Sequence, residues 1–251
     1  CQHINFRKLL PIFKKIGITH LFASHASHND YLLEEKYNIK IIPFPLFPFN
    51  YNSKQQSGKN NKYLFSFCGA YDKRYYLTDI RQRLTIFKDN VDCYIKIKNK
   101  WHFEDIVYGN QIKKKNILID TKEEEVEFSE LLLNSTFSLC PGGSGPNSIR
   151  LWESLSYGCI PVILSNEHKL PDFIHWGDFC ILYNDKNISN LYEYLISIPK
   201  EKINLMKEKC KEVFNSYFSK ENFNKTIDIY FENSFIKIDN KIRVEFIPIK
   251  I

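Results

Sequence analysis

Residues 138–164, SLCPGGSGPNSIRLWESLSYGCIPVIL, place a glycine-rich turn and a helix-like segment between two apolar runs. The runs at 136–141 and 160–165 have the length of strands and are mostly apolar, which predicts strands buried on both faces of a sheet. The segment between them has apolar residues at helical spacing and ends at Gly158. A strand, a helix and a second strand in this order predict a parallel sheet that is covered by helices.

The alternation of strand and helix recurs along the chain. Further strands are predicted at 18–24, 39–47, 62–70, 92–98 and 178–184. Further helices are predicted at 6–17, 31–38, 77–89, 123–135, 188–198 and 199–218, with a hairpin at 235–249. We therefore expect an α/β fold with parallel sheets in two domains, an amino-terminal one at 1–115 and a carboxy-terminal one at 116–251.

Composition excludes several classes of protein. With 251 residues, 43% of them hydrophobic and 15% aromatic, the chain has room for one large or two small domains and is not disordered. No apolar stretch has the length of a membrane-spanning helix, and the first residues do not resemble a signal peptide. The chain begins with Cys1 instead of Met, so the sequence leaves open whether a further segment precedes it. We expect a cytoplasmic protein by default, or one of the Golgi lumen if a membrane anchor precedes Cys1; membrane association is otherwise left open.

The net charge and the positions of the cysteines indicate which compartment, partners and metal sites to expect. The formal net charge of +6 favours anionic ligands only mildly, and no basic stripe alternates with aromatic residues as base stacking would require. The seven cysteines lie mostly in apolar runs and form neither a CxxC pair nor a Cys/His cluster at zinc spacing. We therefore predict a reducing compartment, buried thiols, no nucleic-acid partner, no metal site and no cofactor.

The glycine-rich turn lies where parallel sheets bind ligands, beyond the carboxyl end of a strand. Its glycines leave the backbone bare for an anion, and Pro146 fits the first position of the following helix. The unpaired N–H groups of that first turn, with the positive end of the helix dipole behind them, favour a phosphate. The predicted binding residues of this loop are Gly142, Gly143, Ser144, Gly145, Asn147 and Ser148.

A cation and a carboxylate follow on the helix. At about 100° per residue, Arg150, Glu153, Ser154 and Tyr157 share the face opposite the apolar one, so we expect them away from the sheet. Arg150 could hold a diphosphate, and Glu153 could accept hydrogen bonds from a ribose diol. The alternative is an exposed intrahelical ion pair between these two residues, worth about 0.2–0.5 kcal/mol.

The order of these residues resembles the exostosin family of glycosyltransferases. That family carries a Cys-x-Pro-x-Gly run, then Ser-x-Arg-x-x-Glu, then Gly-Cys-Ile-Pro-Val and then Leu-Pro. The matching residues here are Cys140, Pro141, Gly143, Ser148, Arg150, Glu153, 158–162, Leu170 and Pro171. Upstream, residues 62–84 look like the family's Phe-x-Gly strand and the arginine-bearing helix after it. Downstream, residues 187–209 are similar to its closing helices.

The resemblance implies a GT-B fold, in which two Rossmann-like domains with parallel sheets face each other across a cleft. It implies an inverting transfer of a sugar from a nucleotide sugar, usually UDP-linked, to a glycan or polysaccharide acceptor, without a metal in the chemistry. By position, Glu153 would bind the ribose. Arg150, the backbone of 142–148 and Arg81, on the helix after Gly69, would hold the diphosphate.

This sequence departs from the family pattern in two places. Gly142 stands where the family commonly has a basic residue, which puts one phosphate contact in doubt. The amino-terminal half is short for a complete Rossmann domain, so we expect the acceptor side to be truncated or remodelled. Arg150 remains the candidate catalytic residue for stabilising the departing diphosphate.

Inversion also requires a general base across the cleft from the phosphates. The loop ASHASHND follows the predicted strand at 18–24 and offers His25, His28 and Asp30. Histidine titrates near neutral pH, so His25 is the candidate base and Asp30 the group that would orient it. The alternative is a loop whose polar side chains only cap turns. His168 and His175, farther along the chain, are expected to pack or to face solvent; the alternative is that one of them contacts the donor sugar.

Two other functions stay open at this point. One is a catalytically inert partner subunit of the same fold that stabilises another transferase. The other is a GDP-sugar-dependent enzyme similar to fucosyltransferases, where the Gly-Cys-Ile-Pro-Val element recurs loosely. Both homo-oligomers and hetero-oligomers are compatible with this sequence.

Overall fold

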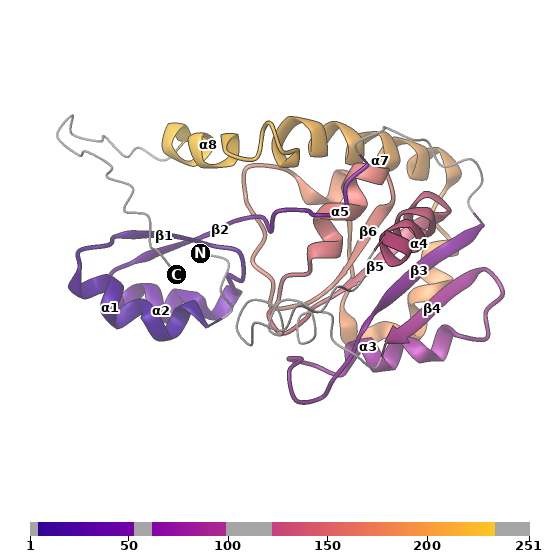
Figure 1. Cartoon of the computed structure of the whole chain (residues 1–251), viewed down its shortest axis with the longest axis horizontal. Helices are drawn as coiled ribbons and strands as arrows, with labels where there is room; N and C mark the ends of the chain where they lie inside the picture. Colours follow the sequence, from indigo (N-terminus) through magenta and orange to yellow (C-terminus); the bar gives the residue numbers. More distant parts are fainter. Residues whose placement is uncertain (1–4, 53–61, 99–121, 234–251) are drawn as a thin grey trace.

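The computed structural model describes residues 5–52, 62–98 and 122–233, and within them the chain forms two parallel sheets (Figure 1). The smaller sheet pairs β1 (His20–Ala23) with β2 (Lys40–Pro43). The larger sheet has the spatial order β4-β3-β5-β6-β7. Its strands are β3 (Tyr63–Ala70), β4 (Cys93–Lys98), β5 (Ser135–Pro141), β6 (Ile160–Leu164) and β7 (Ile181–Leu182).

The amino-terminal unit (residues 5–45) is small. Its helices α1 (Leu10–Lys15) and α2 (Tyr31–Tyr37) lie together below the two strands in Figure 1. They share a core with the strands, formed by Phe6, Leu10, Leu21, Ala23, Ala26, Ile39 and Ile41. A sheet of two strands has little interior of its own, so this unit depends on its helices for burial.

The carboxy-terminal unit (residues 62–98 and 122–218) contains the larger core. Its helices are α3 (Ile80–Arg83), α4 (Lys122–Leu133), α5 (Ile149–Tyr157), α6 (Leu191–Ile196) and α7 (Lys200–Val213). Every residue of β5 and β6 is buried, which confirms the predicted strands that are covered on both faces. Trp152 of α5 is fully buried, with Phe218 and Trp176 at edge-to-face distances of 4.9 and 5.7 Å.

Several predicted elements differ in extent. The helix predicted at 77–89 is a short α3 followed by a 3-10 turn at Leu84–Phe87. The strand predicted at 178–184 is confined to the two residues of β7. The hairpin predicted at 235–249 lies outside the described residues.

The predicted division into domains does not follow the sheets. The predicted boundary at 115–116 itself lies outside the described residues, but β4 before it and β5 after it both belong to the larger sheet. The change of sheet comes earlier, between β2 and β3. Hydrophobic patterning shows where strands are and not which of them pair, so the change of sheet could not be predicted from it.

Helix α8 (Lys225–Asn233) returns to the amino-terminal unit after the carboxy-terminal unit is complete (Figure 1). The Tyr230 ring contacts Phe22 of β1 at 5.8 Å and Phe173 of the larger unit at 5.8 Å. Phe223, just before α8, packs edge-to-face on Phe44 at 5.4 Å. The end of the chain therefore connects the two units. Among the helices of the described ranges, none is both long and apolar enough to cross a lipid bilayer.

Candidate functional site

The glycine loop (residues 142–148) joins the carboxyl end of β5 to the start of α5. The Gly142 N–H donates to the Leu164 carbonyl at 3.4 Å, and the Gly143 N–H donates to the Gly145 carbonyl at 2.9 Å. Gly142, Gly143 and Ser144 are half-buried, whereas the rest of the loop is buried. Its first three residues are thus the part that a ligand can reach.

Helix α5 begins later than predicted. Its first residue is Ile149 and Ser148 is the N-cap, so the prediction that Pro146 occupies the first helical position is wrong. The Ser148 side chain accepts no capping hydrogen bond from the first turn. The N–H groups at this end of the helix dipole consequently have no side-chain acceptor, which suits an anion.

Arg81 reaches the glycine loop from α3, as predicted. Its Nε donates to the Gly142 carbonyl at 3.0 Å, and its Nη1 donates to the Ala70 carbonyl at 2.9 Å. The Tyr76 ring covers the guanidinium, with Cζ 4.5 Å from the ring centroid. Arg81 is buried. Burial, and next the charge of Arg150, lower the pKa of Arg81 to about 10.

Arg150 reaches the same place from α5. Its Nη2 donates to the Cys68 carbonyl in β3, and its Cζ lies 4.5 Å from the centroid of the Phe67 ring. Arg150 is 8% exposed, and among the described residues its Nε has no hydrogen-bond partner. Gly69 makes this approach possible, because a Cβ atom there would lie 2.9 Å from Nη2 of Arg150 and 3.4 Å from Nη1 of Arg81.

The two guanidiniums form a positively charged pair at the carboxyl end of β3. Both lie over the Phe67 ring, whose centroid is 5.6 Å from Cζ of Arg81 and 4.5 Å from Cζ of Arg150. In the part of the chain that the structure describes, neither guanidinium forms an ion pair with a carboxylate. Two buried cations without a counter-ion are costly unless an anion binds there. The arrangement therefore favours binding of a diphosphate.

The expectation that the polar side of α5 lies in the open is wrong. Arg150, Glu153, Ser154 and Tyr157 were expected on a face away from the sheet, yet all residues from Arg150 to Tyr157 are buried. The strands, α4, α7 and the linker (residues 46–52) surround this helix, so neither face is open. An exposed intrahelical ion pair between Arg150 and Glu153 is thereby excluded.

Glu153 holds the linker in place. Its Oε1 accepts a hydrogen bond from the Asn50 N–H at 3.0 Å, and Ser156 Oγ accepts one from the Asn52 N–H at 3.0 Å. Glu153 is 3% exposed, and burial raises its pKa to about 6 against the opposing hydrogen bond from Asn50. The structure thus places this carboxylate against the linker and not in an open cleft, contrary to the expected geometry. The ribose-binding role stays a prediction.

His25 lies against the glycine loop from the amino-terminal unit. A Cβ atom at Gly145 would overlap the imidazole, with His25 Nδ1 as the nearest atom. His25 is buried. The structure therefore brings the predicted base next to the predicted phosphate loop, although the two residues are far apart in the sequence.

Asp30 does not orient the His25 ring. Its Oδ1 and Oδ2 accept from Nε and Nη2 of Arg7 at 2.6 and 2.8 Å, and Oδ2 also accepts from the Ser27 N–H at 2.8 Å. This is a capping box with a bidentate ion pair, which corrects the predicted catalytic role and agrees with the turn-capping alternative. Arg7 also donates to the His25 carbonyl at 2.9 Å, so the pair fixes the backbone of the loop.

Asn147 is not directed at a ligand either. Its Nδ2 donates to the Ser24 carbonyl at 2.7 Å, and its Oδ1 accepts from Trp152 Nε1 at 2.9 Å. The residue is 3% exposed. Both ends of the amide are therefore used inside the protein, so the side chain is not available to a nucleotide, and the predicted contact of the Asn147 backbone stays a prediction.

His168 joins the wall between the two units. It forms an isolated antiparallel bridge with Ser27 and is 5% exposed. Burial, followed by the charges of His25 and His28, lowers the pKa of His168 to about 3. Of the outcomes expected for His168, the structure shows packing inside the protein.

Residue-by-residue reasoning missed the aromatic residues and the linker amide. Phe67 lies beneath both guanidiniums, Tyr76 covers Arg81, and Asn50 binds Glu153. Phe67 carried a signal, because it is the Phe of the Phe-x-Gly run. No local signal marks Tyr76 or Asn50.

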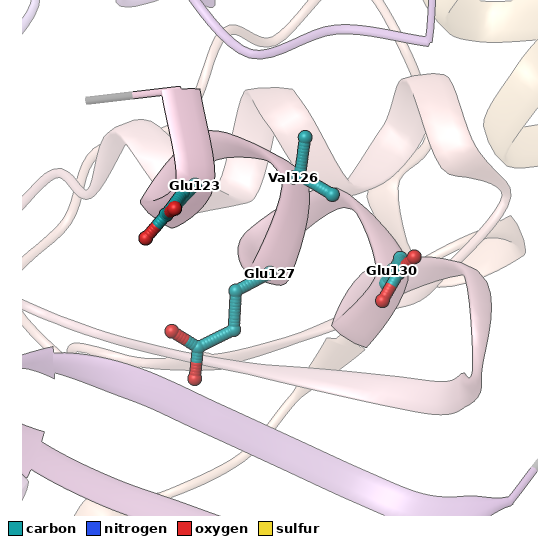
Figure 2. Close-up of a pocket in the computed structure, with 4 residues that line it drawn as sticks. All are labelled: Glu123, Val126, Glu127 and Glu130. Atoms are coloured by element: carbon teal, nitrogen blue, oxygen red, sulfur yellow. The ribbon is translucent and has the colours of Figure 1, made fainter. Parts of the chain in front are cut away.

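A pocket of about 410 Å³ lies elsewhere, on α4 (Figure 2). Glu123, Val126, Glu127 and Glu130 line it, and Figure 2 shows that all four come from this helix. Three carboxylates repel a diphosphate, so this pocket is not the nucleotide site. Over the described ranges, no group of three or more His, Cys, Asp and Glu side chains is placed to hold a metal ion. This observation does not test whether the reaction needs a metal.

Comparison with known proteins decides the family. The Exostosin GT47 domain model matches residues 14–199, which is more than half of the chain. The chain belongs to the exostosin GT47 family. The resemblance at residues 138–171 is thereby confirmed, and the domain extends into the amino-terminal unit, where the sequence motifs matched only loosely.

Relatives of the exostosin GT47 family are longer than this chain. The exostosin-1 homolog of Caenorhabditis elegans is 28% identical over 220 residues, which is 81% of this chain and 55% of that protein. A probable glycosyltransferase of Arabidopsis thaliana is 32% identical over 104 residues, 40% of this chain and 22% of that protein. The chain thus spans about half the length of the first of these relatives.

Solved structures show the fold of this exostosin GT47 chain. TarM superposes with a TM-score of 0.53 at 11% identity, covering 90% of this chain and 45% of TarM. A TarM mutant from S. aureus, in complex with fondaparinux, alpha-GlcNAc-glycerol and UDP, gives 0.50 at 13% identity, covering 84% and 43%. The predicted GT-B fold with parallel α/β sheets is confirmed.

Proposed function

We propose that this chain is a glycosyltransferase that transfers a sugar from a nucleotide sugar, with UDP as the nucleotide, to a glycan acceptor. The observation that carries the proposal is the pair of buried guanidiniums, Arg81 and Arg150, beside the bare backbone of the glycine loop. Membership of the exostosin GT47 family supports sugar transfer. The complex of a structurally similar TarM mutant with UDP supports the choice of nucleotide.

In the proposed reaction, the acceptor hydroxyl attacks the anomeric carbon with inversion while the bond from that carbon to the diphosphate breaks. The negative charge that develops on the diphosphate is stabilised by Arg81, Arg150 and the N–H groups at the start of α5, which are already in position. His25 lies across the glycine loop and takes the proton of the acceptor hydroxyl. These steps need no metal, because the guanidiniums of Arg81 and Arg150 stabilise the negative charge of the departing diphosphate.

Glu153 takes part only if its hydrogen bond to the linker is exchanged. The Asn50 N–H occupies Oε1, and the carboxylate is almost fully buried. A ribose hydroxyl would have to replace that N–H as the donor. Binding of the ribose would then also loosen the linker between the two units.

The nucleotide site can be tested by calorimetry with UDP and with inorganic pyrophosphate. Arg150→Met and Arg81→Met keep the apolar bulk and remove the charge, so each is expected to weaken binding by about 1.5–3 kcal/mol, the value of a hydrogen bond to a charged group. Arg83→Met is the matched control, because Arg83 lies on α3 with Arg81 but its side chain donates to the Lys186 carbonyl at 3.5 Å and not to the glycine loop. Unchanged affinity in both active-site variants would remove the diphosphate site.

Turnover is tested separately by measuring UDP release from a panel of UDP-sugars, with GDP-sugars as the comparison. We expect release from at least one UDP-sugar. Arg150→Ala is expected to cost about 2–3 kcal/mol of transition-state stabilisation, as for the loss of one leaving-group donor. Tight UDP binding without release from any sugar would instead support the inert partner subunit.

A further inference from the structure

We infer that Asn147 is a positioning residue that holds the His25 loop in register with the glycine loop. The inference rests on the proposed function and adds to it a residue that touches no substrate. The Asn147 amide is the direct link between the two units at this point, because its Nδ2 donates to the Ser24 carbonyl at 2.7 Å. Ser24 is the residue before the proposed base.

The orientation of the amide is determined by its other end. Trp152 Nε1 donates to Asn147 Oδ1 at 2.9 Å, so Nδ2 must face Ser24. Trp152 is fully buried in the core of the carboxy-terminal unit and cannot follow a movement of the loop. The Asn147 side chain therefore fixes the Ser24 carbonyl relative to the core of the carboxy-terminal unit. Arg150 is attached to the same core.

The His25 backbone is fixed on its other sides as well. Arg7 Nη2 donates to the His25 carbonyl at 2.9 Å, and Ser24 Oγ donates to the Pro45 carbonyl at 3.0 Å. These two bonds lie within the amino-terminal unit and keep the loop rigid. Asn147 is the side chain that connects this rigid loop to the glycine loop, two residues after Gly145, against which the His25 ring lies.

Other contacts attach the same loop on the carboxy-terminal side of the base, beginning at Ala26, the residue after His25. The Lys169 N–H donates to the Ala26 carbonyl at 3.1 Å, and the His28 N–H donates to the Glu167 carbonyl at 3.1 Å. These bonds keep the loop docked when the Asn147 bond is lost. Removing the amide should therefore shift the base locally and leave the two units together.

The test uses Asn147→Asp, which has nearly the same shape. The Trp152 N–H can still donate to a carboxylate oxygen, but the second oxygen faces the Ser24 carbonyl and repels it. Asn134→Asp is the matched control, because Asn134 Nδ2 donates to the Glu130 carbonyl at 2.8 Å at an exposed position outside the glycine loop. Trp152→Phe is the second variant, since it keeps the Asn147 donor and removes the bond that orients it, together with part of the indole packing against Phe218 and Trp176.

The first readout is the imidazole spectrum of ¹⁵N-histidine-labelled protein without ligand, with the His25 signal assigned from its absence in His25→Gln. We expect the His25 signal to move in Asn147→Asp, to move less in Trp152→Phe, and to stay in place in Asn134→Asp. This readout needs no activity, so it tests the inference even if UDP does not bind. An unmoved His25 signal in a folded Asn147→Asp protein would overturn the inference; if that variant does not fold, an unmoved signal in Trp152→Phe overturns it.

The second readout separates positioning from ligand binding. In Asn147→Ala, which removes the amide without adding a charge to the glycine loop, we expect the affinity for UDP to stay within about twofold of the wild-type value, because the diphosphate ligands are intact. We expect kcat for UDP release to fall by up to about a hundredfold, the loss that follows a displacement of about 1 Å. Equal losses in UDP affinity and kcat would assign Asn147 to the nucleotide site and contradict the inference. Absence of UDP binding to the wild-type protein would instead refute the proposed function.

Discussion

At the scale of single residues, burial decides how the ionisable groups around the glycine loop behave. Glu153 and His168 are each at most 5% exposed, and burial disfavours the charged form of both. The pKa of Glu153 is raised and that of His168 is lowered. The two residues therefore change the stability of the protein in opposite directions with pH, and each can be isolated by a neutral substitution.

Glu153 should make the protein less stable as pH rises. Because its pKa is about 6 in the folded state and near 4.5 when unfolded, its contribution is fully present below pH 4.5 and is lost as pH rises through 6. The loss amounts to about 2 kcal/mol. Glu153→Gln keeps an acceptor for the Asn50 N–H and does not titrate. In urea denaturation, the free energy of unfolding of Glu153→Gln should rise relative to that of the wild type by this amount between pH 4.5 and 7.5. A difference that stays constant with pH would contradict the raised pKa of Glu153.

His168 should make the protein less stable as pH falls. Its pKa is about 3 in the folded state and ordinarily near 6.5, so the stability from the neutral ring is present above pH 6.5 and decreases toward pH 3. The slope is at most about 1.4 kcal/mol per pH unit. Relative to His168→Gln, the wild type should lose stability between pH 6.5 and 4 in chemical denaturation. A difference between the two proteins that stays constant over this range would contradict the lowered pKa of His168.

Arg150 should lower the stability of the protein when no ligand is bound. Its guanidinium is buried, has no ion pair among the described residues and makes one hydrogen bond, to the Cys68 carbonyl. Replacing an uncompensated buried charge by an apolar side chain of similar size is often neutral or stabilising. Arg150→Met should therefore have an equal or higher Tm than the wild type without ligand, and lose most of the Tm increase caused by UDP. A fall in Tm of the ligand-free variant would show that Arg150 is needed for folding.

At the scale of elements, α5 is a helix enclosed on all sides whose end is set by Gly158. This residue has φ 64°, the left-handed conformation that favours glycine at a helix C-terminus. A Cβ atom there would lie 2.7 Å from Lys211 Cε and 3.2 Å from the Lys207 carbonyl. The close contact with α7 thus requires glycine for space as well as for conformation.

Two glycine substitutions separate these causes. Gly17, after α1, has φ 81°, and no atom would contact a Cβ placed there within 4 Å. Gly17→Ala should cost about 1–2 kcal/mol for the left-handed backbone alone. Gly158→Ala should cost more, because Lys211 must also move. Urea denaturation of both variants measures the difference, and equal costs would mean that α7 does not restrict this position.

At the scale of the whole molecule, the two units are joined by the linker, the glycine loop and the returning helix α8. The aromatic contacts before and within α8 reach the amino-terminal unit at Phe44 and Phe22. That unit has a small core of its own, so its stability should depend on these contacts.

A double-mutant cycle between Phe44 and Phe223 tests this dependence. Their rings lie 5.4 Å apart at an interplanar angle of 87°, a geometry worth about 0.5–1.5 kcal/mol beyond the buried area. We expect this coupling energy when the free energy of unfolding of the whole chain is measured. The same cycle between Phe173 and Tyr217, which lie within one unit, is the control. A coupling near zero for Phe44 and Phe223 alone would show that the amino-terminal unit unfolds separately.

The existence and order of most strands and helices could be predicted from the sequence, because they depend on local patterns. The apolar runs of β5 and β6, the glycines between β5 and α5, and Gly158 at the end of α5 all act on neighbouring residues. The family motif likewise led to Arg81, Arg150 and the loop. Strand pairing depends on residues that are far apart in the sequence, and the domain boundary was placed wrongly for that reason.

The sequence by itself determined which groups could meet a diphosphate, since glycine, arginine and a helix start have that chemistry in any fold. Only the tertiary structure decided which polar side chains were already engaged. Glu153 binds an N–H 103 positions away, and Asn147 binds a carbonyl 123 positions away. Polar side chains take the partners that folding brings within about 3 Å, and no local pattern contains that information.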